Sequence, residues 1–220
     1  MKEDSRIQIE DYDEQYRDQL YDLHRQIFLS VDGGVERYKS SQERLEQEID
    51  SLRTVIVTKA DKLIGFGICG PLKDIPPYSD RSPFIEEIQN QLDWGRCPEE
   101  KDLLLQHMKK DQEEMGGKAV VRFYDNDFTR SKYQAVDTDY YFTDIGVVPE
   151  YRGRGIGMEL IKRRIAIARS GNASAIFVMC WNGGNVSRLY RRLDFHPILK
   201  AGPSYYDGNA AKLMGKFIKR

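Results

Sequence analysis

The stretch YRGRGIGMEL, Tyr151 to Leu160, places three glycines and two arginines within six residues, immediately before a segment with helical character. Glycine weakens a helix, so this concentration at a helix start needs another reason. The first N–H groups of a helix have no intrahelical acceptor, and the helix dipole favours negative charge there. Glycine lets an anion approach these groups closely, and the stretch therefore predicts an anion-binding helix N-terminus.

Two common nucleotide-binding motifs do not fit this stretch. A P-loop requires GxxxxGK followed by serine or threonine, which the chain lacks. A dinucleotide-binding fold places GxGxxG near its first strand, whereas RGRGIG lies about two-thirds of the way along the 220 residues. The anion site must therefore belong to another class of protein.

The length and composition indicate one soluble α/β protein. A chain of 220 residues can form one substantial domain, here predicted to span 1–220. No apolar run approaches the roughly 18 residues that cross a bilayer, so no membrane partner is expected. The N-terminal MKEDSRIQIE lacks the apolar region of a signal peptide, and Cys69, Cys97 and Cys180 show no pattern. We expect a reduced, cytoplasmic protein.

The near-neutral total charge hides a strong asymmetry. Residues 151–220 contain 14 lysines and arginines against 3 aspartates and glutamates, a net charge of +11, while residues 1–150 carry -12. A basic C-terminal third could hold a polyanion, and the acidic remainder could receive a cation. Both could equally be solvated surface.

Hydrophobic periodicity and turn signals predict alternating strands and helices. The region 71–118 carries five prolines and is predicted to be a helical insertion. Two glycines inside the strand 63–70 indicate close backbone approach or a bulge. The predicted strands are 6–10, 53–59, 63–70, 118–124, 139–148, 174–180, 195–200 and 210–219, and the predicted helices outside the insertion are 13–28, 35–52, about 156–170 and 185–193.

The pattern RxxGxG, here Arg152, Gly155 and Gly157 after DIGVVPEY, resembles the pyrophosphate-binding signature of the GNAT superfamily of acyl-CoA-dependent N-acyltransferases. The following SAIFVMC and SRLYRRLDF agree with the family's order of a strand and then a helix with an LY pair. This resemblance implies acetyl-CoA as co-substrate. It also implies an α/β fold with a mixed, mostly antiparallel sheet flanked by helices, whose central parallel strands, 140–148 and 174–180, are parted around the pantetheine arm.

The resemblance also assigns cofactor-binding residues. Backbone groups of Ile145, Gly146 and Val147 would contact the acetyl-pantetheine end, where one N–H polarises the thioester carbonyl. An asparagine common in the family would fall on Gly183, so Asn185 or Asn182 is left to hydrogen-bond the pantetheine. Asp194 replaces a usual glycine in the LYxxLGF run. The residues expected around the pyrophosphate are Arg152, Gly153, Arg154, Gly155, Ile156, Gly157 and Met158.

Direct acyl transfer to an amine needs a proton donor for the thiolate and a base for the amine. Tyr190 occupies the family's LY position and is the candidate general acid; the alternative is a core aromatic that packs with Leu189 or Leu193. Asp144 is the candidate general base. It could instead anchor a cationic amine or form a structural salt bridge.

An acidic run near the expected acceptor channel favours a cationic amine, either a small molecule or a protein amino group. Two glutamate-rich stretches, 41–51 and 98–115, could form a homodimer surface. The run consists of Asp125, Asp127, Asp137, Asp139 and Asp144.

Other partners and chemistries are not predicted. The pI near 6.3 and the absence of a recognised module argue against nucleic acid, so the arginines at 163, 164, 188, 191 and 192 are expected to lie mostly on solvated helix faces. His24, His107 and His196 lack metal-ligand spacing, and we predict no metal. Cys180 lies on a buried strand and is expected to be inert.

Two functional interpretations follow. In the first, which we adopt, the protein is an N-acetyltransferase. In the second, it is a catalytically inactive GNAT-shaped module that binds acyl-CoA or regulates a partner.

Overall fold

The computed structural model describes residues 6–28, 35–75, 120–125, 127–131, 133, 135–181, 185–202 and 211–218. These residues form two compact units, each assembled from two stretches of chain. Unit 1 contains Met1–Pro76 and Tyr140–Ala173, and unit 2 contains Pro77–Asp139 and Ser174–Arg220. Most of the predicted insertion lies outside the described residues. The single-domain assignment stays a prediction.

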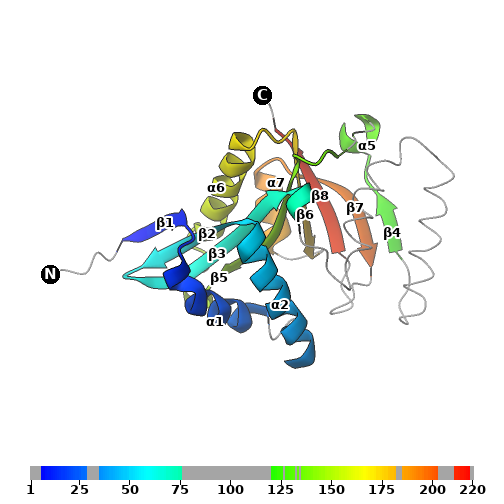
Figure 1. Ribbon diagram of the computed structural model, residues 1–220. Helices are drawn as coiled ribbons and strands as arrows, with labels where there is room; N and C mark the ends of the chain where they lie inside the picture. The colour runs from blue at the N-terminus through cyan, green and yellow to red at the C-terminus, as the bar shows by residue number, and fades with distance from the viewer. Residues whose placement is uncertain are drawn as a thin grey trace. The chain divides into compact units, whose positions relative to one another are not determined.

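Unit 1 is a four-stranded antiparallel sheet with helices on both faces. Its strand order is β1-β2-β3-β5. Its helix α6 lies on one face of these strands, and α1 and α2 lie on the other (Figure 1). Its elements are β1 Ile7–Asp11, η1 Glu14–Tyr16, α1 Arg17–Phe28, α2 Val35–Ser51, β2 Arg53–Lys59, β3 Lys62–Pro71, η2 Leu72–Asp74, β5 Tyr140–Val147, η4 Pro149–Tyr151 and α6 Ile156–Ser170.

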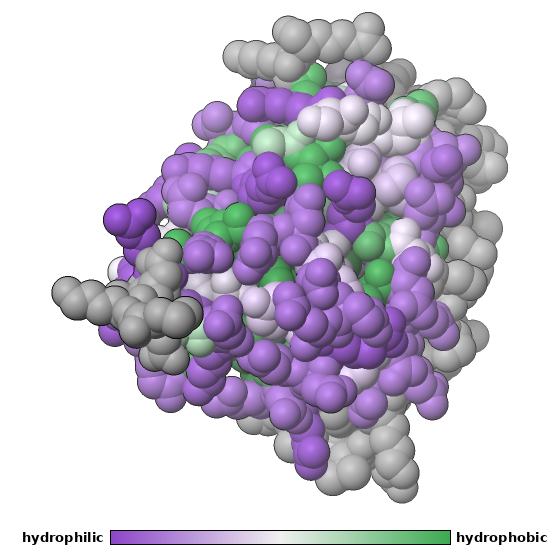
Figure 2. Space-filling view, turned by 60° about the vertical axis from the view of Figure 1, so that its left-hand side comes forward, coloured by the Kyte–Doolittle hydropathy of each residue, from purple (hydrophilic) through white to green (hydrophobic). Residues whose placement is uncertain are grey.

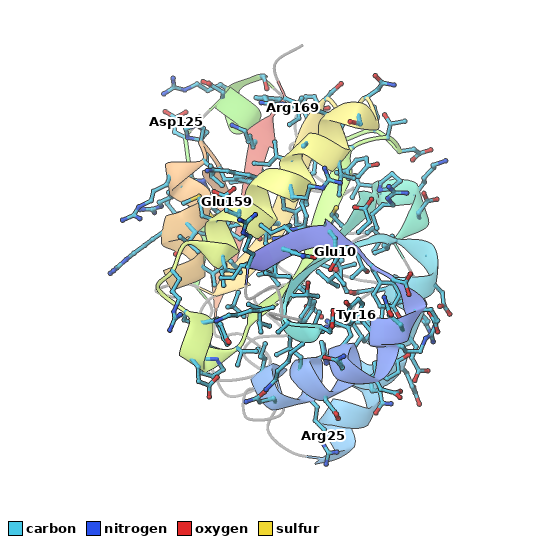
Figure 3. The ribbon with its side chains drawn as sticks, turned by 90° about the vertical axis from the view of Figure 1, so that its left-hand side faces the viewer. Glu10, Tyr16, Arg25, Asp125, Glu159 and Arg169 are labelled. Atoms are coloured by element: carbon cyan, nitrogen blue, oxygen red, sulfur yellow. The ribbon has the colours of Figure 1, made fainter. Side chains whose placement is uncertain are left out.

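Apolar residues on both faces of β2 and β3 explain this arrangement. Both strands are buried along most of their length, as expected for strands covered on two sides. Val55 and Val57 pack with Leu160 of α6. In Figure 3, Glu159 and Arg169 mark the two ends of α6 on one side of the strands, whereas Arg25 projects from α1 on the other.

The charged sequence of α2 is typical of an exposed helix, but one face of α2 is buried. Leu45 and Glu48 are completely buried, and Ile49 is 8% exposed. These residues follow one another at helical spacing and continue to Leu52, so they form one stripe that faces the core. The many charged residues on the other faces of α2 obscured this stripe in the sequence.

Unit 2 is a second antiparallel set of strands, in the order β6-β8-β7-β4. The helix α7 packs against β6. The short helix α5 was not predicted. The elements are β4 Val120–Phe123, α5 Asp127–Ser131, β6 Ala175–Trp181, α7 Asn185–Arg192, β7 His196–Gly202 and β8 Ala211–Phe217.

One face of the molecule is predominantly polar (Figure 2). Hydrophilic side chains cover most of the face shown in Figure 2, with small separate hydrophobic areas between them. Within the described ranges, no helix is both long enough and apolar enough to cross a membrane.

Candidate active site

The glycine-rich loop opens directly into the start of α6. Gly155 is the N-cap of this helix, and Gly153 and Gly155 have φ angles of +77° and +85°, a region that favours glycine. Among the described residues, no atom lies within 4 Å of the position where a Cβ would stand on either glycine. The loop therefore presents its backbone to open space.

The helix start has the geometry of an anion site. The N–H of Glu159 donates to the Gly155 carbonyl at 3.1 Å. The N–H groups of Ile156, Gly157 and Met158 precede this bond, and the glycine N-cap has no side chain to accept from them. Their positions agree with the predicted pyrophosphate contacts, which stay a prediction.

Cations from three positions gather at this loop. The Nε of Arg152 donates to the Val147 carbonyl at 2.9 Å, which ties the loop to β5. The guanidinium of Arg154 lies 5.2 Å from the ring centre of Tyr151, and the ammonium of Lys59 lies 5.5 Å from the same centre. Tyr151 thus holds two positive charges beside the helix start through cation–π contacts. No sequence motif indicated Lys59, which lies at the end of β2 in the β2–β3 hairpin.

The three residues predicted to contact the thioester, Ile145, Gly146 and Val147, do not all point their N–H groups in the same direction. The N–H of Val148 donates to the Ile64 carbonyl of β3 at 2.9 Å. In an antiparallel ladder, alternate residues bond to the same neighbour, so Gly146 also faces β3. The N–H groups of Ile145 and Val147 consequently point away from β3, as a thioester contact requires.

Gly146 has a packing reason of its own. A Cβ at this position would lie 2.5 Å from Cδ1 of Ile27 in α1 and 2.6 Å from Cε1 of Phe66 in β3. A side chain here would require Ile27 and Phe66 to move. Glycine at this position therefore allows Ile27 and Phe66 to pack closely on β5.

A β-bulge lies immediately before these residues. Gly67 pairs with Ile145 and Cys69 pairs with Phe142, so Thr143 and Asp144 together stand opposite one residue of β3. The ladder is interrupted here, and the bulged residues need other partners for their polar groups. Helices on both faces of the sheet provide them.

On the α1 and α2 face, a buried polar cluster holds Asp144. Its Oδ2 accepts from Nη2 of Arg44 at 2.5 Å and lies 3.2 Å from Nε2 of His24. The hydroxyl of Thr143 donates to Glu48 at 2.8 Å. His24 and Glu48 are completely buried. Asp144 thus forms a salt bridge with Arg44, which was one of the alternatives to a general-base role, and His24 lies beside this pair.

The residues around Asp144 were missed by sequence reasoning, although their spacing held a signal. His24 follows Leu20 by four positions and precedes Ile27 by three, which places it on the apolar face of α1. Glu48 lies between Leu45 and Ile49 in the buried stripe of α2. A polar residue on such a face indicates a partner inside the fold.

On the other face of the sheet, Arg164 is completely buried, which corrects the expectation of a solvated arginine. Its Nη1 donates to the carbonyls of Ile68 at 3.1 Å and Asp144 at 3.3 Å. Its guanidinium carbon lies 4.4 Å from the ring centre of Phe142. The signal was again periodicity, because Arg164 lies four residues from both Leu160 and Ala168 on the buried face of α6.

In unit 2, Tyr190 is completely buried on α7, and its ring centre lies 5.0 Å from that of Phe195. Packing in the core was the alternative to an acid role, although the neighbour seen here is Phe195 and not the expected Leu189 or Leu193, and the acid role stays a prediction. Asp194 has a φ angle of +61°, so it adopts the left-handed turn for which the family uses glycine. Asn185 begins α7, whereas Asn182 and Gly183 lie outside the described residues.

Two further expectations have clear outcomes. Burial raises the pKa of the Cys180 thiol to about 11, which agrees with an inert structural cysteine.

The aspartates of the acidic run bind separate partners. Asp125 pairs with Arg130 at 2.6 Å, Asp139 is buried and binds backbone N–H groups, and Asp144 pairs with Arg44.

Comparison with known proteins identifies the class of enzyme. A family model described as the acetyltransferase (GNAT) family matches residues 75–195, more than half of the chain. The chain therefore belongs to this family. The predicted enzyme class, an acetyl-CoA-dependent N-acetyltransferase, is confirmed. No curated protein matches the sequence significantly.

Solved structures show the same fold at low sequence identity. One is yncA, a putative acetyltransferase from Salmonella typhimurium with its cofactor acetyl-CoA, at 13% identity and a TM-score of 0.52, covering 97% of this chain and 94% of that one. Another is Arabidopsis thaliana NAA60 in complex with acetyl-CoA, at 18% identity and 0.55, covering 97% and 99%. A third is the ribosomal-protein-alanine N-acetyltransferase from Brucella melitensis, at 13% and 0.53, covering 96% and 99%.

These likenesses confirm the predicted GNAT-like α/β fold class. Acetyl-CoA is the acetyl donor of this class, as predicted, and two of the three relatives contain it. The open glycine loop of this chain is the predicted site for the diphosphate of such a donor. The parting of the strands 140–148 and 174–180 stays a prediction.

Proposed function

We propose that this protein transfers the acetyl group of acetyl-CoA directly to a primary amine. The observation that carries the proposal is the junction of β5 and α6. There, the N–H groups of Ile145 and Val147 point away from β3, and the loop that follows opens its glycine backbone to solvent. The strand β5 could thus contact the thioester end of a donor, while the start of α6 contacts the diphosphate of the same donor.

Two side chains would move the protons. The amine nitrogen attacks the carbonyl carbon, a C–N bond forms and the C–S bond breaks. Tyr190 would give its phenolic proton to the departing thiolate; a phenol, with a reference pKa of about 10, is protonated at neutral pH and its pKa lies close to that of a thiol. Asp144, directly or through water, would take the ammonium proton of a cationic acceptor before attack, and the second proton that the nitrogen loses would pass to water after attack. Arg44 and His24 hold this carboxylate in one place.

The backbone and the loop would supply binding and polarisation. An N–H of Ile145 or Val147 would donate to the thioester oxygen as negative charge develops on it. The segment from Arg152 to Met158 would hold the diphosphate, and Asn185 would hydrogen-bond the pantetheine. Arg152 and Arg154 lie in the loop itself, where their charges favour a bound anion.

The acceptor is proposed to be a cationic amine, either a small molecule or a protein amino group. The support for a cationic substrate is the net charge of -12 on residues 1–150, since Asp144 itself is already paired with Arg44. One relative by name acts on an alanine of a ribosomal protein, so peptide N-termini belong among the amines to be tested.

The test is a thiol-release assay with acetyl-CoA and a panel of polyamines, aminoglycosides, amino acids and peptides. We expect release with at least one amine. Tyr190→Phe is expected to lower kcat by about 100-fold while the CoA affinity from calorimetry stays unchanged, because only proton transfer is lost. Asp144→Asn should lower kcat with the same amine.

Tyr133→Phe is the matched control, since it removes a phenol that bonds to Asp139 in the same unit. It should leave turnover at the wild-type level. Binding of CoA without thiol release from any amine would contradict the proposal and support a module without turnover. Undiminished turnover in Tyr190→Phe would remove that residue from the acid role.

A further inference from the structure

The bulge in β5 is held from both faces of the sheet. On one face, Arg44 and His24 contact the side chain of Asp144. On the other face, Arg164 donates to the backbone carbonyls of Asp144 in β5 and Ile68 in β3. Both carbonyls lie where the hydrogen-bond ladder between these strands is interrupted. Arg164 thereby links β3 to β5 where they do not bond to each other in register.

A buried arginine is costly, so its site must be built for it. Arginine is charged at all ordinary pH values, and removing that charge from water is unfavourable unless donors are satisfied. Here the guanidinium is completely buried, donates to two carbonyls and lies over the face of Phe142. These contacts fix both its distance from the sheet and the plane in which it lies.

Gly67 of β3 provides the space for this group. A Cβ on Gly67 would lie 3.0 Å from Nε of Arg164 and 3.3 Å from its Cδ and Cζ. Any other residue would press against the guanidinium. The second glycine in GFGICG therefore serves Arg164, which accounts for the close approach that the sequence indicated.

We infer that Arg164 is a positioning residue for acetyl transfer: it sets the bulge of β5 and, through it, the direction of the Ile145 and Val147 N–H groups toward the thioester. Ile145 follows Asp144 directly, so a displaced Asp144 carbonyl turns the peptide plane that carries the Ile145 N–H. In this role Arg164 acts through the backbone of β5. This inference rests on the proposed function.

The test measures the polarisation of the thioester directly. The carbonyl stretching frequency of bound, carbon-13-labelled acetyl-CoA is recorded by infrared spectroscopy without an amine. In the wild type, hydrogen bonding should lower this frequency relative to acetyl-CoA in solution. In Arg164→Met, the frequency should return toward the solution value, and kcat should fall by about 100-fold while the CoA affinity changes by less than about threefold.

Arg163→Met is the matched control. Arg163 is the neighbouring arginine on α6, with a side chain that is 48% exposed and pairs with Asp11. It should show the wild-type frequency and turnover. If Arg164→Met does not fold, Gly67→Ala provides the same comparison, because it displaces the guanidinium without removing it, and a frequency between those of the wild type and the solution is expected.

The outcomes separate the inference from the proposed function. A wild-type frequency shift that persists unchanged in a folded Arg164→Met, or in Gly67→Ala if the first variant does not fold, would overturn the role of Arg164 alone. Failure of the wild type to bind acetyl-CoA would overturn the proposed function, and the inference with it.

Discussion

Among single residues, Asp139 connects a loop to the start of a strand within unit 2. Its carboxylate is completely buried. One oxygen accepts from the N–H groups of Ser174 at 3.1 Å and Ala175 at 2.8 Å, and the other accepts from Val136 at 3.0 Å and from the Tyr133 hydroxyl at 2.8 Å. Four donors on one buried carboxylate make it a strong structural contact.

Asp139→Ala should lower the free energy of unfolding by about 3–5 kcal/mol, because it leaves several buried donors without an acceptor. Urea denaturation measures the change. Asp137→Ala, at an exposed position two residues earlier, should change the value by less than about 0.5 kcal/mol. If Asp139→Ala lowered the free energy of unfolding no more than Asp137→Ala does, the Asp139 carboxylate would contribute little to stability.

Cys69 makes stability depend on pH in the alkaline range. Burial raises the pKa of its thiol from 9.0 to about 12. The thiol stays neutral in the folded protein while it ionises in the unfolded chain, so its contribution to stability is complete below pH 9 and is lost as the pH rises through the folded pKa. The slope from this one group is about 1.4 kcal/mol per pH unit.

Comparison of the wild type with Cys69→Ala isolates this effect. Between pH 9 and pH 10.5, the free energy of unfolding of the wild type should fall by about 2 kcal/mol more than that of the variant. Urea titrations at a series of pH values provide the measurement. Parallel pH profiles would mean that the thiol is not shielded from water.

At the scale of helices and strands, the sequence was a good guide wherever local signals decide the structure. The hairpin of β2 and β3, the end of β5 before Pro149 and the end of α6 before Gly171 all lie where turn residues predicted them. Hydrophobic periodicity correctly predicted whether each of these elements is a strand or a helix.

What the sequence did not reveal depends on contacts between distant segments. The bulge at Thr143 and Asp144 exists because side chains from α1, α2 and α6 provide partners for it. These side chains, His24, Glu48 and Arg164, lie on the buried faces of their helices, where each one is a polar residue within an otherwise apolar pattern. Only the assembled sheet shows that these interruptions meet at one point.

The start of α6 allows backbone strain to be separated from obstruction of the anion site. Gly155→Ala should lower the free energy of unfolding by about 1 kcal/mol, since alanine is strained at a φ of +85°. Gly155→Asn should cost less, because asparagine tolerates this region. Both side chains enter the open space before the helix, so CoA affinity should fall at least about tenfold in both.

Calorimetry with CoA and urea denaturation, applied to both variants, measure the two effects. If CoA affinity followed stability, with Gly155→Asn binding like the wild type, the loop would act through its conformation and not through access to its N–H groups.

At the scale of the whole molecule, charge is divided along the chain. The net +11 of residues 151–220 includes the loop and helix expected to hold the phosphates of CoA. CoA affinity should therefore fall severalfold between about 50 and 500 mM NaCl, as screening reduces long-range attraction. Calorimetric titrations at several salt concentrations test this, and a salt-independent affinity would assign the basic residues to surface solvation alone.

The central claim is that backbone N–H groups at the start of α6 hold the diphosphate of acetyl-CoA. Calorimetric titration with CoA and with pantetheine, which carries the thiol arm but no diphosphate, tests it most directly. CoA should bind at least about 100-fold more tightly, the equivalent of one or two charge-assisted hydrogen bonds. Equal affinities for the two ligands would contradict the claim.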